Sequence, residues 1–360
     1  MANHDIGAII DDRIGEVRFE ALDLSFGEIA SLHEQRELVI DPDYQRLFRW
    51  SEDQRSRLIE SVLLRLPLPQ IFLIENDNGV LELIDGLQRV SSVLQFFDSK
   101  IIDLEPLRLD GCDLIPQLNG LVFTDLSLSV RLALKRTPIR AVIIKKQSKG
   151  FLKYEMFKRL NTGGSVLSSQ EIRNCSLRML DGGADFYSEL QTFARYDSFS
   201  RAISTLSDAD RDQKIDEELV VRYLALKNGR HLFKGSVRDW LDKYLEDILV
   251  SSTPFSWNDE RAIFQSLFDF IHDIFGSVAF VKYRDGRPIG ALAPAYFEAI
   301  SMGFLERFEV AHEKDSENLR DSVIQMLESD EFRSQTGPGA NSRPKLDRRI
   351  ELITEAIDAA

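Results

Sequence analysis

The sequence predicts an α+β protein with a mixed N-terminal domain and a mainly α-helical C-terminal domain. In the first half of the chain, short apolar runs with strand-like alternation lead into amphipathic helices. Residues 181–360 instead show mainly the 3.6-residue apolar spacing of helices. A chain of 360 residues also exceeds one ordinary hydrophobic core. We therefore expect two domains, residues 1–180 and 181–360.

The stretch 80–97 is the centre of the predicted N-terminal domain. Its first residues alternate as in a strand, Asp85 and Gly86 interrupt the pattern, and an amphipathic helix follows with Gln88 and Arg89 in its first turn. The apolar positions that carry this interpretation are Val80, Leu81, Leu83 and Ile84 for the strand and Val90, Val93, Leu94 and Phe97 for the helix. A strand that feeds a helix N-terminus with an arginine beside it is typical of an anion site.

The neighbouring elements follow from turn and cap residues. Ser51, followed by acidic residues, predicts a helix start, and Pro67 and Pro69 predict its end. A strand over 71–75 and a hairpin turn over 76–79 lead into the central strand. Further elements are expected as a short strand over 38–40, a short helix near 126–134 and an apolar strand over 138–144.

Arg140 is the single charge in the apolar run 138–144. The uninterrupted apolar pattern predicts a strand buried in a sheet. A charge buried there requires an acidic partner or a bound phosphate. Arg140 is therefore a candidate phosphate ligand.

Composition limits the function classes. The net charge of −14 argues against a protein that coats DNA non-specifically, because such affinity comes mainly from lysine and arginine. Residues 131–160 are an exception, with ten basic residues and one acid, Glu155. This segment is either a solvated face of a strand and helix or a surface that attracts a nucleotide or nucleic acid.

The sequence shows no leader segment and no apolar run of the roughly 20 residues that a membrane span needs, so we expect a cytoplasmic protein without membrane contact. Cys112 and Cys175 lack the spacing of a zinc site or a disulfide framework. We expect both to be reduced, structural thiols.

Two further segments contain candidate anion ligands. Tyr44, Gln45 and Arg46 fall in the loop before the helix that starts at Ser51, where the aromatic ring packs on the domain edge or stacks on a base. The corner 161–164, Asn-Thr-Gly-Gly, ends one helix before a second begins at Ser168 with a capping-box pattern to Glu171. This corner either joins two helices or presents backbone amides to an anion.

Four segments together resemble the GmrSD-type restriction family N-terminal domain. They are DPDYQRLFRWSEDQ, LPLPQIFL, LIDGLQRVSSVLQFF and FKRLNTGGSVLSSQEIRN, in the family's order and spacing. The resemblance covers roughly residues 25–180 and continues more faintly through 283–289 and 336–353. It implies a ParB/sulfiredoxin-like α+β domain that binds a nucleoside triphosphate and, in characterised relatives, hydrolyses it to control DNA cleavage in antiviral defence.

The resemblance also implies roles for individual residues. The family's central motif, Asp-Gly-Gln-Gln-Arg, matches residues 85–89, with Asp85, Gln88 and Arg89 as candidate catalytic residues. The candidate nucleotide-binding residues are Tyr44, Gln45, Arg46, Gly86, Arg140, Asn161, Thr162, Gly163 and Gly164. Leu87 replaces the first glutamine, which affects hydrolysis more than binding. Asp85 and Glu171 are candidate Mg²⁺ ligands, since Mg²⁺ prefers carboxylates and phosphates, although Asp85 alternatively caps the helix.

The C-terminal half lacks the histidine spacing of an HNH or other metal nuclease. We therefore expect that any DNA cleavage is performed by a separate nuclease subunit or by chemistry that no motif in the sequence reveals. In the segment 336–344, Asn341, Ser342 and Arg343, or the following Arg348, either belong to a surface connection or help to complete a phosphate site.

Two functions remain from the sequence. The first is an NTP-binding and candidate NTP-hydrolysing component of a restriction-type defence system that senses or controls action on DNA. The second is a non-catalytic nucleic-acid-binding or regulatory module that retains the same fold.

Overall fold

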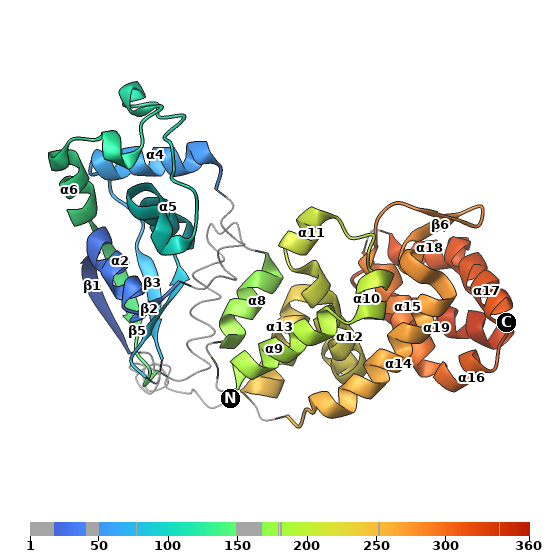
Figure 1. The fold of residues 1–360 in the computed structure, drawn as a ribbon. Coiled ribbons are helices and arrows are strands. Elements are labelled where there is room, and N and C mark those ends of the chain that lie inside the picture. Colours follow the sequence, from blue (N-terminus) through green and yellow to red (C-terminus); the bar gives the residue numbers. More distant parts are fainter. Residues whose placement is uncertain are drawn as a thin grey trace, which may run out of the picture. The chain divides into compact units, whose positions relative to one another are not determined.

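The computed structural model describes residues 18–40, 50–76, 78–148, 168–178, 180, 182–250, 253–337 and 339–360. The chain forms two compact units, Met1–Gly163 and Gly164–Ala360. The first contains a five-stranded sheet with helices, and the second is mainly helical (Figure 1). The predicted α+β class is confirmed. The boundary after residue 180 stays a prediction, and helix α8 (Ser169–Arg178) already lies in the second unit.

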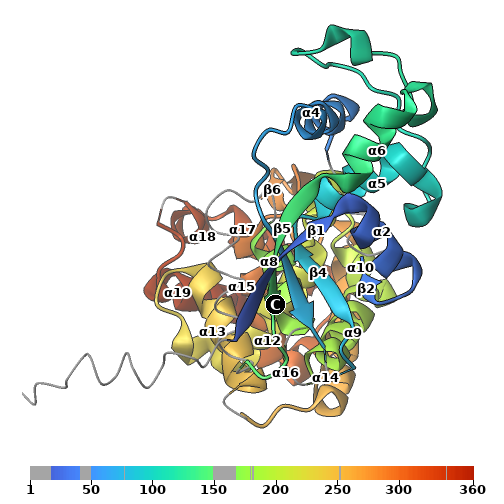
Figure 2. The same ribbon diagram turned by 90° about the vertical axis from the view of Figure 1, so that its left-hand side faces the viewer.

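The sheet of the first unit has the strand order β1-β5-β3-β4-β2. Its strands are β1 (Phe19–Ser25), β2 (Leu38–Val39), β3 (Ile71–Glu75), β4 (Leu81–Asp85) and β5 (Pro138–Ile144). Strand β3 is antiparallel to β4 and parallel to β5. The start of β3, the end of β4 and the start of β5 therefore lie at the same end of the sheet. Figure 2 shows the sheet from a second side.

Among the described residues of the first unit, four helices pack on the sheet and on one another to form its core. They are α2 (Phe26–Glu34), α4 (Glu52–Leu63), α5 (Leu87–Asp98) and α6 (Leu128–Arg136). Their apolar stripes share one cluster with alternate residues of the strands, such as Ile71, Leu73 and Ala141. Three short 3₁₀ turns, η1 (Ser99–Ile102), η2 (Pro116–Leu118) and η3 (Phe123–Asp125), lie between α5 and α6. Both views place α4 and α6 toward one end of the sheet (Figures 1 and 2).

Helices α2 and α4 end in the same way, with an arginine in the left-handed backbone region. Arg36 has φ 61° and Arg65 has φ 56°. After α2 the N–H of Arg36 donates to His33 O and that of Glu37 to Leu32 O, and after α4 Arg65 and Leu66 repeat this pattern with Val62 and Ser61. This is the Schellman arrangement, in which glycine is the common residue at the left-handed position.

We expect Arg36→Gly and Arg65→Gly each to raise the free energy of unfolding by about 0.5–1 kcal/mol. A left-handed conformation costs a non-glycine residue roughly 1–2 kcal/mol, and the greater freedom of glycine in the unfolded chain offsets about half of that. Urea titration of the two variants measures the effect. Destabilisation of both variants would contradict the assigned backbone strain, whereas a loss at one site alone would identify a side-chain contact there.

The second unit contains helices of five to nineteen residues and a two-stranded hairpin. Its longer helices are α9 (Gly183–Ala194), α12 (Ile215–Gly229), α13 (Val237–Leu249), α14 (Trp257–Phe275), α15 (Pro294–Glu306), α17 (Ser316–Glu328) and α19 (Arg343–Ala359). The shorter helices are α10 (Asp197–Ala202), α11 (Asp208–Asp212), α16 (Phe308–His312) and α18 (Asp330–Thr336), with η4 (Arg230–Leu232) and η5 (Gly276–Val278). Strands β6 (Lys282–Arg284) and β7 (Arg287–Ile289) form the hairpin. The core of this unit is aromatic, and it includes Phe264, Phe268 and Phe304.

A buried network of charged side chains joins five helices of this unit. Arg173 on α8 donates to Asp242 on α13 (2.8 Å) and to Glu218 on α12 (3.1 Å). Glu218 also accepts from Arg222, whose Nη1 donates to Glu298 on α15 (2.6 Å). Glu298 in turn accepts from Arg349 on α19. Three positive and three negative groups alternate along this network, so its formal charge is balanced.

The network also changes proton affinities. Burial alone raises the pKa of Glu218, but Arg222 and Arg173 outweigh burial and lower it from its usual value. Burial lowers the pKa of Arg222, and the carboxylates of Glu298 and Glu218 outweigh it and raise that pKa. Glu218 and Arg222 are therefore both charged in the folded protein.

Within the described ranges, no helix is both long enough and apolar enough to cross a membrane.

Candidate functional site

The central predicted motif forms the turn between β4 and α5. Gly86 precedes the first residue of α5 and has φ 102°. The first helical hydrogen bond runs from the N–H of Val90 to Gly86 O (2.9 Å). Because glycine has no side chain, the residue before this helix offers no side-chain acceptor to the N–H groups of the first turn. The predicted strand–turn–helix is thus present, with the helix dipole directed as an anion site requires.

Gly86 also allows a close approach between this turn and β3. A Cβ atom placed there would lie 2.4 Å from Ile71 Cγ2 and 3.0 Å from Ile71 Cβ. Ile71 is fully buried in the core. The turn therefore packs against the start of β3 in a way that only glycine permits.

Arg89 holds this turn to two neighbours. Its Nη2 donates to Asp85 Oδ2 (3.0 Å) and to Gln70 O (3.0 Å), just before β3. Its Nε is buried and has no hydrogen-bond partner among the described residues. The alternative in which Asp85 caps α5 does not describe the structure, because its carboxylate is paired with Arg89 instead.

Gln88 connects the turn to the start of α4. Its Oε1 accepts from the N–H of Trp50 (3.2 Å), and Trp50 O accepts from Nε of Arg55 (3.0 Å). The Nη1 of Arg55 donates to Gln95 Oε1 on α5 (2.8 Å). Burial lowers the pKa of Arg55 from its usual value, and Glu52 acts in the opposite direction.

Arg55 and Gln95 are polar residues of this region that the sequence analysis missed. Gln95 lies seven residues after Gln88, so the two share one face of α5, and this spacing was the available signal.

Arg140 is exposed rather than buried, so the expectation of a buried charge was wrong. It is 54% exposed, and its Nη1 donates to Asp23 Oδ1 (3.0 Å) on the neighbouring strand β1. The two residues are direct partners in the strand register. The alternation of β5 places Ile139 and Ala141 in the core and Arg140 on the opposite face. Its role in nucleotide binding stays a prediction.

The remaining predicted ligands are placed as follows. Tyr44, Gln45 and Arg46 and the corner Asn161, Thr162, Gly163 and Gly164 lie outside the described residues. Glu171 forms the predicted capping box of α8, since its Oε2 accepts from the N–H of Ser168 (2.6 Å) and its N–H donates to Ser168 Oγ (3.1 Å).

Metal binding by Asp85 and Glu171 stays a prediction. Within the described part of the chain, no group of three or more His, Cys, Asp or Glu side chains is placed to hold a metal ion. Mg²⁺ commonly binds one or two protein carboxylates together with phosphate oxygens and water. The Asp85 side chain is 35% exposed, so such an ion can reach it.

The two cysteines are buried and neither is in a disulfide bond, as expected. Burial, followed by Glu60, Asp113 and Asp110, raises the pKa of Cys112 to about 11. The thiol is therefore protonated at neutral pH and is a poor nucleophile or metal ligand.

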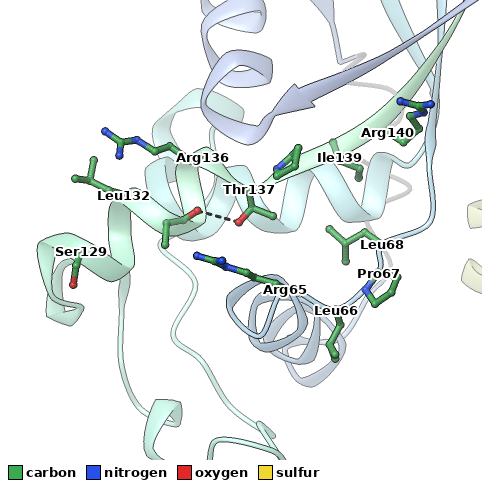
Figure 3. Close-up of a pocket in the computed structure, with 12 residues that line it drawn as sticks. Arg65, Leu66, Pro67, Leu68, Ser129, Leu132, Arg136, Thr137, Ile139 and Arg140 are labelled. Carbon is green, nitrogen blue, oxygen red and sulfur yellow. Dashed lines mark hydrogen bonds between the residues drawn. The ribbon is translucent and has the colours of Figure 1, made fainter.

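A cleft of about 750 Å³ lies between the segment after α4, helix α6 and the start of β5 (Figure 3). Arg65, Arg136 and Arg140 line it together with apolar residues such as Leu66 and Leu132. None of its described lining residues is acidic or aromatic. Arg136 and Arg140 belong to the basic segment 131–160, whereas Arg65 reaches the same surface from a distant part of the sequence, which the local pattern does not predict.

Comparison with known proteins identifies the N-terminal part of the chain. Residues 27–178 match the family model of the GmrSD restriction endonuclease, N-terminal domain. This part of the chain belongs to that family. The GmrSD N-terminal domain thus extends from α2 through α8 and contains the β4–α5 turn. No curated protein and no solved structure matches the chain.

Proposed function

We propose that this protein is a nucleoside-triphosphate-binding component of a restriction-type defence system that acts on DNA. The family of residues 27–178 supports the restriction-type role. The observation that carries nucleotide binding is the β4–α5 turn, where the first turn of α5, without a capping side chain, lies beside an arginine. Together these groups favour negative charge at one point, as a triphosphate requires.

Each residue of the turn has a distinct role in this proposal. Gly86 supplies the left-handed turn after which the N–H groups of the first turn of α5 are left without a capping side chain. Arg89, fixed by Gln70 O and Asp85, supplies a positioned positive charge whose exposed fraction is 17%. Asp85 binds Mg²⁺ on the phosphates. Gln88, in the first turn of α5, orients water beside them. Leu87, which replaces a glutamine of the family motif, makes binding a stronger expectation than hydrolysis.

Isothermal titration of the full chain with ATP, CTP, GTP and UTP plus Mg²⁺ tests this function. We expect micromolar-scale binding of at least one nucleotide and a dissociation constant about 10- to 100-fold higher for Arg89→Ala, because a charge-assisted hydrogen bond contributes roughly 1.5–3 kcal/mol. Release of phosphate in the same samples, with and without DNA, separates binding from hydrolysis.

Arg57→Ala is the matched control, since it also removes an Arg–Asp pair from the same unit (Arg57–Asp113, 3.4 Å). It should bind nucleotide like the unmodified chain. Absence of binding at millimolar nucleotide, or equal affinity of Arg89→Ala and the unmodified chain, would contradict the proposal and favour a non-catalytic nucleic-acid-binding module. Whether the protein binds nucleotide or only nucleic acid, we propose that any nuclease is a separate subunit.

A further inference from the structure

The cleft lined by Arg65, Arg136 and Arg140 carries more positive charge than its structural surroundings require. Arg140 is paired with Asp23, but Arg65 and Arg136 have no ion-pair partner among the described residues. The chain as a whole has a net charge of −14, so a surface whose described lining has three arginines and no carboxylate departs strongly from its average. Such a surface attracts a polyanion.

Helix ends account for part of this charge. Arg136 is the last residue of α6 and Arg65 follows the end of α4, so both are near the partial negative charge of a helix C-terminus. That effect does not require an arginine at a strained backbone position, however. Arg65 keeps a side chain where glycine is the common residue, and the side chain extends into the cleft toward Thr137 (Figure 3).

Other cations of α6 do not share this environment. Lys135, the neighbour of Arg136, lies over the rings of Phe97 (4.9 Å) and Phe123 (5.7 Å). Arg131 also lies over Phe123 (5.9 Å). Only Arg136 of these three lines the cleft. The helix thus directs one of its cations to the cleft and packs the other two on aromatic rings.

The arrangement of the cations indicates the class of anion. Arg136 and Arg140 lie on opposite sides of the cleft (Figure 3). Each extended residue between them spans about 3.3 Å, so the two guanidinium groups do not meet at one point. A compact triphosphate is held by groups that converge on one point, whereas a phosphodiester backbone is held by cations that are spread along it. Among the described residues, the lining also has no aromatic side chain on which a base would stack.

We propose that this cleft binds the phosphodiester backbone of DNA, without reading its sequence, at a surface separate from the β4–α5 turn. Backbone contacts of this type position a protein on nucleic acid and depend strongly on salt. The inference rests on the proposed function for the identity of the polyanion as DNA. It adds a binding site that nucleotide recognition at the turn does not explain.

Fluorescence anisotropy with a labelled 20-base-pair duplex and the corresponding single strand tests this site, using the full chain at 25–200 mM NaCl. The test variant is Arg65→Gly/Arg136→Gln. The control is Arg36→Gly/Lys135→Gln, which removes the same total charge, makes the same change at an equivalent helix end and alters the same helix α6 outside the cleft.

We expect the test variant to bind DNA at least about tenfold more weakly at 50 mM NaCl, and the slope of log K against log salt to fall in magnitude by about 1.4–1.8, the value for two lost phosphate contacts. The control should keep both the affinity and the slope of the unmodified chain. Weaker binding by a test variant whose unfolding midpoint is not lowered excludes misfolding as the cause. The duplex and single-strand arms show which form of DNA the cleft accepts.

Three results would overturn this proposal: no DNA binding by the unmodified chain at 25 mM NaCl, equal salt slopes for the test and control variants, or a test variant that loses nucleotide affinity while keeping DNA affinity. Nucleotide titration of the same samples keeps the two proposals separable. If the test variant loses DNA binding but keeps nucleotide binding, the result supports the DNA site in the cleft. If the unmodified chain binds DNA through the cleft but binds no nucleotide, the result contradicts only the function assigned to the β4–α5 turn.

Discussion

Replacement of Arg349 by methionine is expected to lower the free energy of unfolding of the helical unit by about 3–5 kcal/mol. The side chain is 2% exposed, donates to Glu298 and Ala340 O, and forms one end of the buried charge network. Its removal leaves three carboxylates against two guanidinium groups in a low-dielectric interior, and an uncompensated buried charge of this type is strongly destabilising. Urea or guanidinium unfolding followed by circular dichroism measures the change.

Arg348 is the control for this prediction, because it precedes Arg349 on the same helix and also contacts acidic residues. Its partners are Glu331, Glu351 and Glu355, all at least half exposed, and it is itself 34% exposed. Surface ion pairs contribute little, so Arg348→Met should cost less than about 1 kcal/mol. Equal effects at the two positions would show that the buried network does not control stability.

A double variant tests the charge balance itself. If both Glu298 and Arg349 are replaced by methionine, the remaining groups, Arg173, Asp242, Glu218 and Arg222, are again balanced. The double variant should therefore be destabilised by clearly less than the sum of the single changes. A strictly additive result would mean that the two side chains act independently.

The sequence does not predict this network for a physical reason. Charged residues are seldom buried, so a charged side chain such as Glu218, Arg222 or Glu298 by itself predicts solvent exposure. Glu298 is buried, and Glu218 and Arg222 are largely so, because α12 and α15 pack against further helices on more than one side. The number of neighbours of a helix is a property of the tertiary fold and is not encoded in its local periodicity.

The central turn was predictable because local signals and tertiary structure agree there. The break at Asp85 and Gly86 separates β4 from α5 as expected, and α5 begins at Leu87. Caps were equally informative: Ser51 forms a capping box with Gln54, and Ser168 forms one with Glu171. Such features depend on residues within a few positions of one another, so a single sequence contains them.

Arg140 shows where the same approach fails. An apolar run around one arginine predicts burial on both faces of a sheet, but the outcome depends on which strand lies beside it. β1 pairs with β5 and brings Asp23 opposite Arg140, a contact between residues that are 117 positions apart. Strand order likewise determines that Arg89 meets Gln70 O and that Arg65 lies at the cleft.

Gly86→Ala is expected to destabilise the first unit by about 2–5 kcal/mol. A left-handed backbone costs alanine roughly 1–2 kcal/mol, and the new Cβ atom would lie 2.4 Å from Ile71 Cγ2, an overlap that typically costs a further 1–3 kcal/mol or so. Ile71 cannot rotate away at low cost, because its side chain is fully buried and branches next to the backbone. Chemical denaturation followed by the fluorescence of Trp50, in a chain whose other two tryptophans are replaced by phenylalanine, reports on this unit.

Gly79→Ala separates the steric contribution from the backbone contribution. Gly79 also has a positive φ (79°), but a Cβ atom there would have no neighbour within 4 Å. It should cost only the backbone part, about 1–2 kcal/mol, and the difference between the two variants measures the contact with Ile71. If the close approach at Gly86 serves the phosphate site, Gly86→Ala also raises the dissociation constant for nucleotide at temperatures where the variant is still folded, whereas Gly79→Ala does not. Equal stability losses would refute the contact, and equal nucleotide affinities in folded samples would restrict Gly86 to a structural role.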